Sequence, residues 1–196
     1  MRRGFSKRVF TARLFFNELG FLIWNLPSII RVFTNNQSPK HLFEKIFIVT
    51  DAVNGCIYCS WLDAKLAMKS GMSEEEINNM MELQFHANAS EYELNALLYA
   101  QHYAETKGNP DPEMLNKLFD YYGERTAKNI MLAIRAVTFG NLYFNTWRAV
   151  VSRLKGNPAP NSNVIFEIVY FLLNAIIILP FAIFRRLDKK AVGIRS

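Results

Sequence analysis

Cys56 and Cys59 are the only cysteines in this 196-residue chain, and they stand three residues apart. On an α-helix this spacing places both sulfur atoms on one side, one turn apart. Gly55 precedes the pair, so we expect Cys56 at the start of a helix, where unpaired N–H groups and the helix dipole stabilise a thiolate. Such a pair suits thiol–disulfide exchange, in which one thiolate attacks and its neighbour closes an internal disulfide. Two small buried apolar side chains at a helix start are the alternative interpretation.

Zinc is a third interpretation of the cysteine pair, and the sequence disfavours it. A closed structural zinc site needs four ligands, and only one cysteine pair is present. The three histidines, His41, His86 and His102, have no ligand spacing with one another. We therefore predict neither a metal nor a cofactor.

The elements that must position the cysteines are all predicted to be helices. Apolar residues recur at helical spacing from about residue 40 to 53, and Asn54-Gly55 predicts the turn that ends this helix. The next helix begins at the cysteines and ends at Gly71. Serines followed three residues later by a glutamate predict capping boxes at two more helix starts: Ser73 with Glu76, and Ser90 with Glu93. A short helix and a long one, from about residue 124 to 154, complete an all-α core.

The residues around the pair resemble a known family. Glu44, the Cys-x-x-Cys pair, the helix ending at Gly71 and the SEEEI segment after it are similar to the alkylhydroperoxidase D-like (AhpD-like) branch of the carboxymuconolactone decarboxylase family. The similarity covers about residues 40–156. The resemblance implies an all-helical bundle that assembles as trimers or hexamers. It also implies a peroxiredoxin-type (alkylhydroperoxidase) enzyme that reduces hydroperoxides and is recharged by a dithiol partner.

The resemblance also implies roles for individual residues. Cys59 would be the thiol that attacks the peroxide, Cys56 the resolving thiol and Glu44 the acidic proton-relay residue. The family has a relay histidine four residues after the second cysteine, and this chain has Asp63 there. An ionised carboxylate one turn from Cys59 would disfavour the thiolate.

Two hypotheses could restore a proton relay at the cysteines. Glu44 and Asp63 could face each other in an apolar site and share one proton. Alternatively, one of the histidines could enter the site, with His86 the favoured candidate because it lies in a polar loop.

Both ends of the chain combine basic residues with apolar stretches. The net charge is +6, but residues 1–13 carry five basic residues and no acid, and residues 185–196 carry five basic residues and one acid. The segment between is slightly acidic, which favours an anionic lipid surface over nucleic acid as the partner. From residue 5 to Pro27 the spacing predicts a basic amphipathic helix that Pro27 ends or kinks. The alternative is an ordinary helix that packs on the domain rather than on lipid.

The last apolar stretch, residues 164–184, holds one charge, Glu167, and is followed by Arg185 and Arg186. A helix of this length could span a bilayer or lie in its surface, and a helix buried between subunits is the alternative. The expected domains are thus a basic amphipathic helix in 1–39, the AhpD-like domain in 40–156, and a linker, hydrophobic helix and basic tail in 157–196.

These expectations support two hypotheses. The first is a membrane-associated thiol peroxidase or disulfide oxidoreductase on the cytoplasmic face, acting on a hydroperoxide or disulfide and recharged by a dithiol. The second keeps the fold but is a catalytically degenerate structural or ligand-binding membrane subunit.

Overall fold

The computed structural model describes residues 5–34, 41–87, 89–160 and 163–187, and within these ranges it contains helices and no strands. The predicted all-α fold is confirmed. The elements in chain order are α1 (Ala12–Thr34), α2 (Leu42–Asn54), α3 (Ile57–Ser70), α4 (Glu74–Met81), the short 3-10 helix η1 (Phe85–Ala87), α5 (Glu91–Glu105), α6 (Pro112–Leu154) and α7 (Val164–Leu187).

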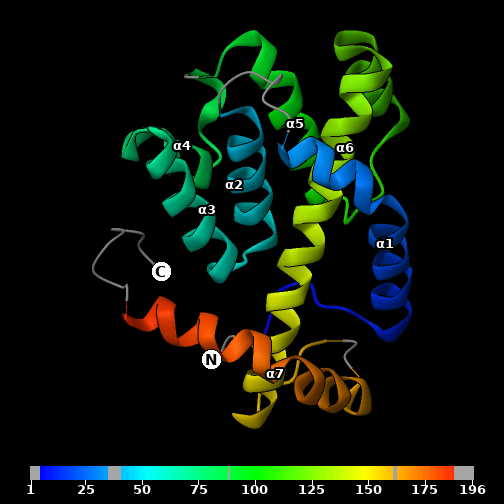
Figure 1. Ribbon diagram of the computed structural model, residues 1–196, viewed down its shortest axis with the longest axis vertical. Coiled ribbons are helices and arrows are strands. Elements are labelled where there is room, and N and C mark those ends of the chain that lie inside the picture. Colours follow the sequence, from blue (N-terminus) through cyan, green and yellow to red (C-terminus); the bar gives the residue numbers. More distant parts are fainter. Residues whose placement is uncertain (1–4, 35–40, 88, 161–162, 188–196) are drawn as a thin grey trace.

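Helix α2 lies at the centre of the bundle, with α3, α4, α5 and α6 packed around it (Figure 1). Its position follows from its sequence, because its apolar residues cover more than one face of the helix. Ile46, Ile48 and Val49 are completely buried and pack with Leu97 of α5 and Ile130 of α6 in the main core. This core fixes the end of α2 from which the chain turns toward the cysteines.

The helix ends follow the local signals in the sequence. Both predicted capping boxes are formed, at Ser73 and at Ser90. Gly71 ends α3 in the left-handed conformation that glycine adopts without strain. Gly123 interrupts α6 with φ 71° and ψ 165°, which separates a short arm from the long arm expected from residue 124.

Helix α1 differs from the prediction at its start, because it begins at Ala12, seven residues later than the apolar stripe indicated. Pro27 lies inside it, which agrees with the predicted kink rather than with an end at Pro27. Proline has no backbone N–H to donate, and Figure 1 shows a bend along α1. The residues before α1 instead run across α6, where the Phe10 N–H donates to Thr146 Oγ1 at 2.9 Å and the Phe10 ring is 1% exposed.

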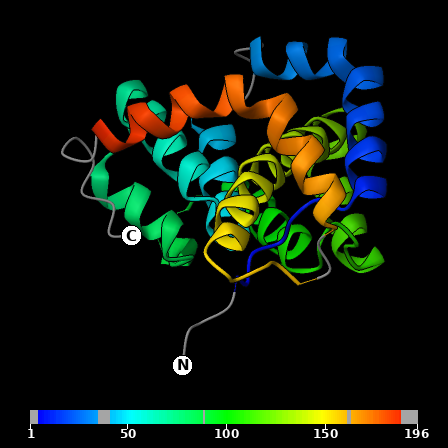
Figure 2. The ribbon, with the colours of Figure 1, turned by 90° about the horizontal axis from the view of Figure 1, so that it is seen from below.

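Helix α7 crosses the end of the bundle and packs on α6 (Figure 2). Its buried side joins a second, largely aromatic cluster, in which the Trp147 and Phe171 rings stack with centroids 4.4 Å apart. Within the described residues no helix is both long and apolar enough to cross a membrane, so the predicted membrane-spanning helix over 164–184 is unsupported. The basic residues Arg2 and Arg3 and the tail from residue 188 lie outside the described residues.

Candidate functional site

The two cysteines form a disulfide at the N-terminus of α3, with Cα atoms 5.4 Å apart. Cys56 is the N-cap residue in an extended conformation, and its Sγ accepts the backbone N–H of Cys59 at 3.3 Å. This confirms the predicted position at a helix start. Cys56 is completely buried, whereas Cys59 is 7% exposed. Cys59 is therefore the more accessible of the two cysteine residues.

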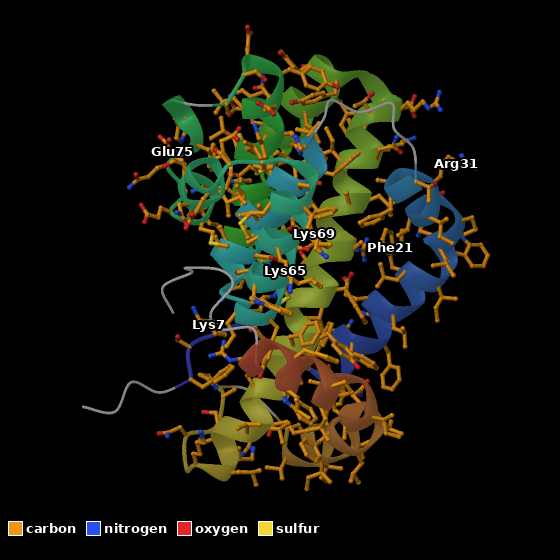
Figure 3. All side chains as sticks on the ribbon, turned by 60° about the vertical axis from the view of Figure 1, so that its left-hand side comes forward. Lys7, Phe21, Arg31, Lys65, Lys69 and Glu75 are labelled. Carbon is orange, nitrogen blue, oxygen red and sulfur yellow. A yellow bond between two sulfur atoms is a disulfide. The ribbon has the colours of Figure 1, made fainter. Side chains whose placement is uncertain are left out.

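The turn before the cysteines is tight and covered. Gly55 has φ 63°, in the left-handed region, and its N–H together with that of Cys56 bonds to the last carbonyls of α2. The Lys7 side chain lies against Gly55, so that a Cβ built on Gly55 would be 2.2 Å from Lys7 Nζ. Figure 3 shows Lys7 below Lys65 and Lys69, toward the end of α3 that carries the cysteines. The left-handed backbone angle favours glycine at this position, whereas the flexible end of Lys7 can move away from a Cβ.

Two carboxyl groups face each other beside the disulfide: Asp63, one turn after Cys59 in α3, and Asp51, in the last turn of α2. Burial raises the pKa of Asp63 to about 6, although the hydrogen bond with Asp51 acts in the opposite direction. Burial raises the pKa of Asp51 well above its usual range. The charge of Asp63 and the hydrogen bond with Asp63 raise this pKa further, whereas the hydrogen bond with Asn141 lowers it.

The hydrogen-bond pattern favours one of the two carboxyl groups, Asp51 and Asp63, as the holder of a proton that they share. Within the described residues Asp51 Oδ2 is buried and accepts no hydrogen bond, while Oδ1 accepts from Asn141 Nδ2 at 2.6 Å. A buried carboxyl oxygen without a donor, next to a second carboxyl group, is satisfied when it carries a proton itself. We therefore assign the proton to Asp51, which donates it to the Asp63 carboxylate.

A buried network of asparagines holds Asp51 in place. Asn54 Nδ2 donates to Asn141 Oδ1 at 2.9 Å, and Asn145 Nδ2 donates to the Asn54 carbonyl at 3.0 Å. These residues come from α2 and α6 and are at most 5% exposed. Because the network joins the last turn of α2 to α6, it fixes the turn that leads to Cys56.

Glu44 lies elsewhere. Its Oε2 is 2.5 Å from His41 Nδ1, and the same nitrogen is 3.2 Å from Ser70 Oγ at the last residue of α3. Ser70 follows Cys59 by eleven residues, which on a helix is about 16 Å. The structure therefore does not bring Glu44 to the cysteines or to Asp63, and the carboxyl group that faces Asp63 is Asp51.

The histidines considered as alternatives are also spread out. His86 is exposed in η1 and stacks on Phe85 with ring centroids 5.0 Å apart. His102 Nε2 accepts the Asp111 N–H at 3.0 Å, before α6 begins. His41 bonds to Glu44, as described above. Among the described residues, no three His, Cys, Asp or Glu side chains are grouped to hold a metal ion.

Asp51 and Asn141 are the site residues that the sequence analysis missed. Each gave a weak signal: Asp51 is a charged residue within an otherwise apolar helical run, and Asn141 and Asn145 are spaced so as to share one face of a helix. A buried polar pair at helical spacing requires partners, but the sequence does not show which element supplies them.

The fold and the site together define a class: an all-helical protein with a Cys-x-x-Cys pair at a helix start. The model of the Carboxymuconolactone decarboxylase family matches residues 31–102, from the end of α1 through most of α5, so this part of the chain is similar to that family. The family resemblance is thereby confirmed. No curated protein and no solved structure matches the chain.

Proposed function

We propose that the chain is a membrane-associated thiol oxidoreductase of the AhpD-like branch, in which Cys56 and Cys59 alternate between dithiol and disulfide. The observation that carries this proposal is the Cys56–Cys59 disulfide at a helix start, with the more exposed cysteine one turn from the half-buried Asp63, which faces the buried Asp51. Thiol chemistry needs a stabilised thiolate and a nearby proton donor. The helix start and the proton on Asp51 supply these two requirements.

The proposed reaction proceeds in three balanced steps. The Cys59 thiolate attacks the outer oxygen of a hydroperoxide, the O–O bond breaks, and Cys59 becomes a sulfenic acid while the peroxide leaves as an alcohol. Cys56 then attacks the Cys59 sulfur, forms the disulfide and releases water. A dithiol reductant attacks the disulfide, is itself oxidised and returns both thiols.

The carboxyl pair has a defined part in this sequence. An alkoxide leaving group needs a proton, and a carboxyl group held neutral by burial can donate one near neutral pH. Sharing one proton also means that Asp51 and Asp63 carry a single negative charge together, which reduces their repulsion of the Cys59 thiolate. Asp63 in place of the family's histidine is thus compatible with proton transfer.

Intact-mass measurement tests the proposal. The protein is reduced with a dithiol, freed of it and treated with a stoichiometric alkyl hydroperoxide. We expect the loss of two hydrogens within the peptide that contains residues 56–59, and an equal amount of alcohol product. The Cys56→Ser variant should stop at the sulfenic acid, which a dimedone probe captures.

Failure of the reduced wild type to react, while its Cys59 thiol remains alkylatable, would contradict the peroxidase proposal and favour the degenerate subunit. A comparison of Asp51→Asn with Asp63→Asn separates proton transfer from folding. Both variants should fold. In both, the reaction of Cys59 with the hydroperoxide should be slower, and the pH dependence of its rate should change.

The membrane part of the proposal depends on the outward face of α7. The side chain of its one acidic residue, Glu167, is 2% exposed and pairs with Arg153 of α6. Its polar side chain Asn174 accepts from Tyr143 of α6 at 2.6 Å. The outward face is left with large exposed apolar residues, among them Leu172, Leu173 and Ile176. An exposed apolar face of this size indicates an interaction surface.

We assign a lipid surface to this face because basic residues follow it in the sequence and precede α1 at the other end of the chain. Flotation with vesicles tests the assignment, and the variant Leu172→Ser/Leu173→Ser should lose binding. Vesicles with anionic lipids should bind more protein than neutral ones. A stable trimer or hexamer that the same variant dissociates, without vesicle binding by the wild type, would assign the face to copies of the chain instead.

A further inference from the structure

A second site lies away from the cysteines, in a cavity of about 630 Å³ between α1, α5 and α6. Cavities of this volume are typical of small-molecule sites. Of the residues that line it, only Tyr99 falls within 31–102, the part of the chain that matches the family. The cavity is therefore formed mainly by elements outside the family segment.

The interior of the cavity is apolar with a phenol-lined wall. Phe21 projects from α1 toward α6 (Figure 3), and Met131 and Leu132 line the cavity from α6. Tyr99 lines it from α5; it is 1% exposed, and within the described residues its hydroxyl has no hydrogen-bond partner. A buried hydroxyl without a partner costs free energy, so a ligand atom that pairs with it gains affinity.

The rim of the cavity is cationic. Arg125 and Lys128 line it and are exposed, and Lys128 pairs with Glu124 while Arg125 has no ion pair within the described residues. Deeper, Arg135 is neutralised by a two-bond contact with Glu18 at 2.8 and 3.1 Å. The uncompensated positive charge therefore lies at the rim and the unpaired hydroxyl lies inside.

We propose that this cavity binds an elongated organic acid with an apolar body and a second polar oxygen at its far end. Its carboxylate lies against Arg125 at the rim, its hydrocarbon chain packs on Phe21 and Leu132, and its far oxygen accepts a hydrogen bond from Tyr99. Charge selects the acid over a neutral alcohol, and the phenol selects the oxygenated acid over the plain one. The proposal is independent of the redox chemistry of the cysteines.

The test measures the affinity of the full-length protein for three probes by calorimetry: dodecanoic acid, 12-hydroxydodecanoic acid and 1-dodecanol. The hydroxy acid should bind about three- to tenfold more tightly than the plain acid, the effect of one hydrogen bond. The alcohol should bind about tenfold more weakly than the plain acid. Arg125→Gln should remove the difference between acid and alcohol, and Tyr99→Phe the difference between hydroxy acid and plain acid.

Two further variants keep the result decisive. Leu132→Trp fills the cavity and should abolish binding of all three probes, whereas Lys117→Gln, on an exposed i,i+4 pair elsewhere on α6, should change nothing. Equal affinities for the three probes, or binding by Leu132→Trp equal to that of the wild type, would overturn the proposal and place the probes on the exposed apolar faces of α1 and α7. Arg125 is on the surface, so its variant remains informative even if Tyr99→Phe does not fold.

Discussion

The cysteine end of α3 and the outward face of α7 differ in opposite ways from a typical protein: polar groups are buried in the first region, and apolar side chains are exposed in the second. Around the disulfide, carboxyl and amide groups are removed from water and are each held by a specific partner, as Asp51 is by Asn141. On α7, aliphatic side chains such as Leu173 stay in contact with water, while Glu167 and Asn174 bond inward to α6. The stability of the fold therefore depends on the hydrogen-bond partners of the buried polar groups near the disulfide. The exposed side chains of α7 contribute little to stability and are the surface to which we assign an external partner.

The largest effect on stability should come from the asparagine network. Asn141→Leu removes the donor to Asp51 Oδ1 and the acceptor of the Asn54 amide, which leaves two buried polar groups unpaired. We expect a loss of about 3 kcal/mol in the free energy of unfolding. Urea unfolding followed by circular dichroism measures it, and a loss below about 1 kcal/mol would show that water replaces the network.

The carboxyl pair should make stability depend on pH. The pKa of Asp63 is raised to about 6 in the folded protein, so the folded state holds its protons more tightly than the unfolded state. The stabilisation of the fold by protonated Asp63, on the order of 2 kcal/mol, is therefore fully present below about pH 4. It is lost as the pH rises through about 6. Unfolding measured from pH 4.5 to 8 should show this decline, and the decline should be smaller in Asp63→Asn, in which burial still raises the pKa of Asp51.

Reduction of the disulfide should have a smaller effect. The bond closes a very short loop, for which the chain-entropy account gives about 2 kcal/mol at most. Thermal unfolding with and without a dithiol measures the change, and Cys56→Ala/Cys59→Ala should reproduce the reduced value. A reduced protein that does not fold would indicate that the disulfide, rather than the bundle, holds the N-terminus of α3.

The smallest effect on stability is expected on α7. Leu172→Ser/Leu173→Ser changes side chains that are already 68% and 71% exposed, so the free energy of unfolding should change by less than about 0.5 kcal/mol. The same variant is predicted to lose vesicle binding, which separates the function of this face from the stability of the fold. A large loss of stability would contradict the assignment of this face to an external partner.

The sequence alone determined the helices of the core, because the signals that end them are local. The turn at Gly55, the cap at Gly71, the capping boxes of Ser73 and Ser90 and the position of Cys56 at a helix start depend on neighbouring residues only, and all are formed. The start of α1 was predicted wrongly, because Phe10, before α1, packs against α6 instead of continuing the helix.

Tertiary structure decided which polar groups meet. Glu44 and Asp51 belong to the same helix, but their seven-residue separation places them about two turns apart, and only Asp51 lies at the end that meets α3 and α6. The burial that raises the pKa of Asp63, and the charges that surround the cavity of Tyr99, likewise depend on residues distant in the chain. Local sequence fixes where a helix begins and ends, whereas the solvation and charge of a side chain depend on what the rest of the chain packs against it.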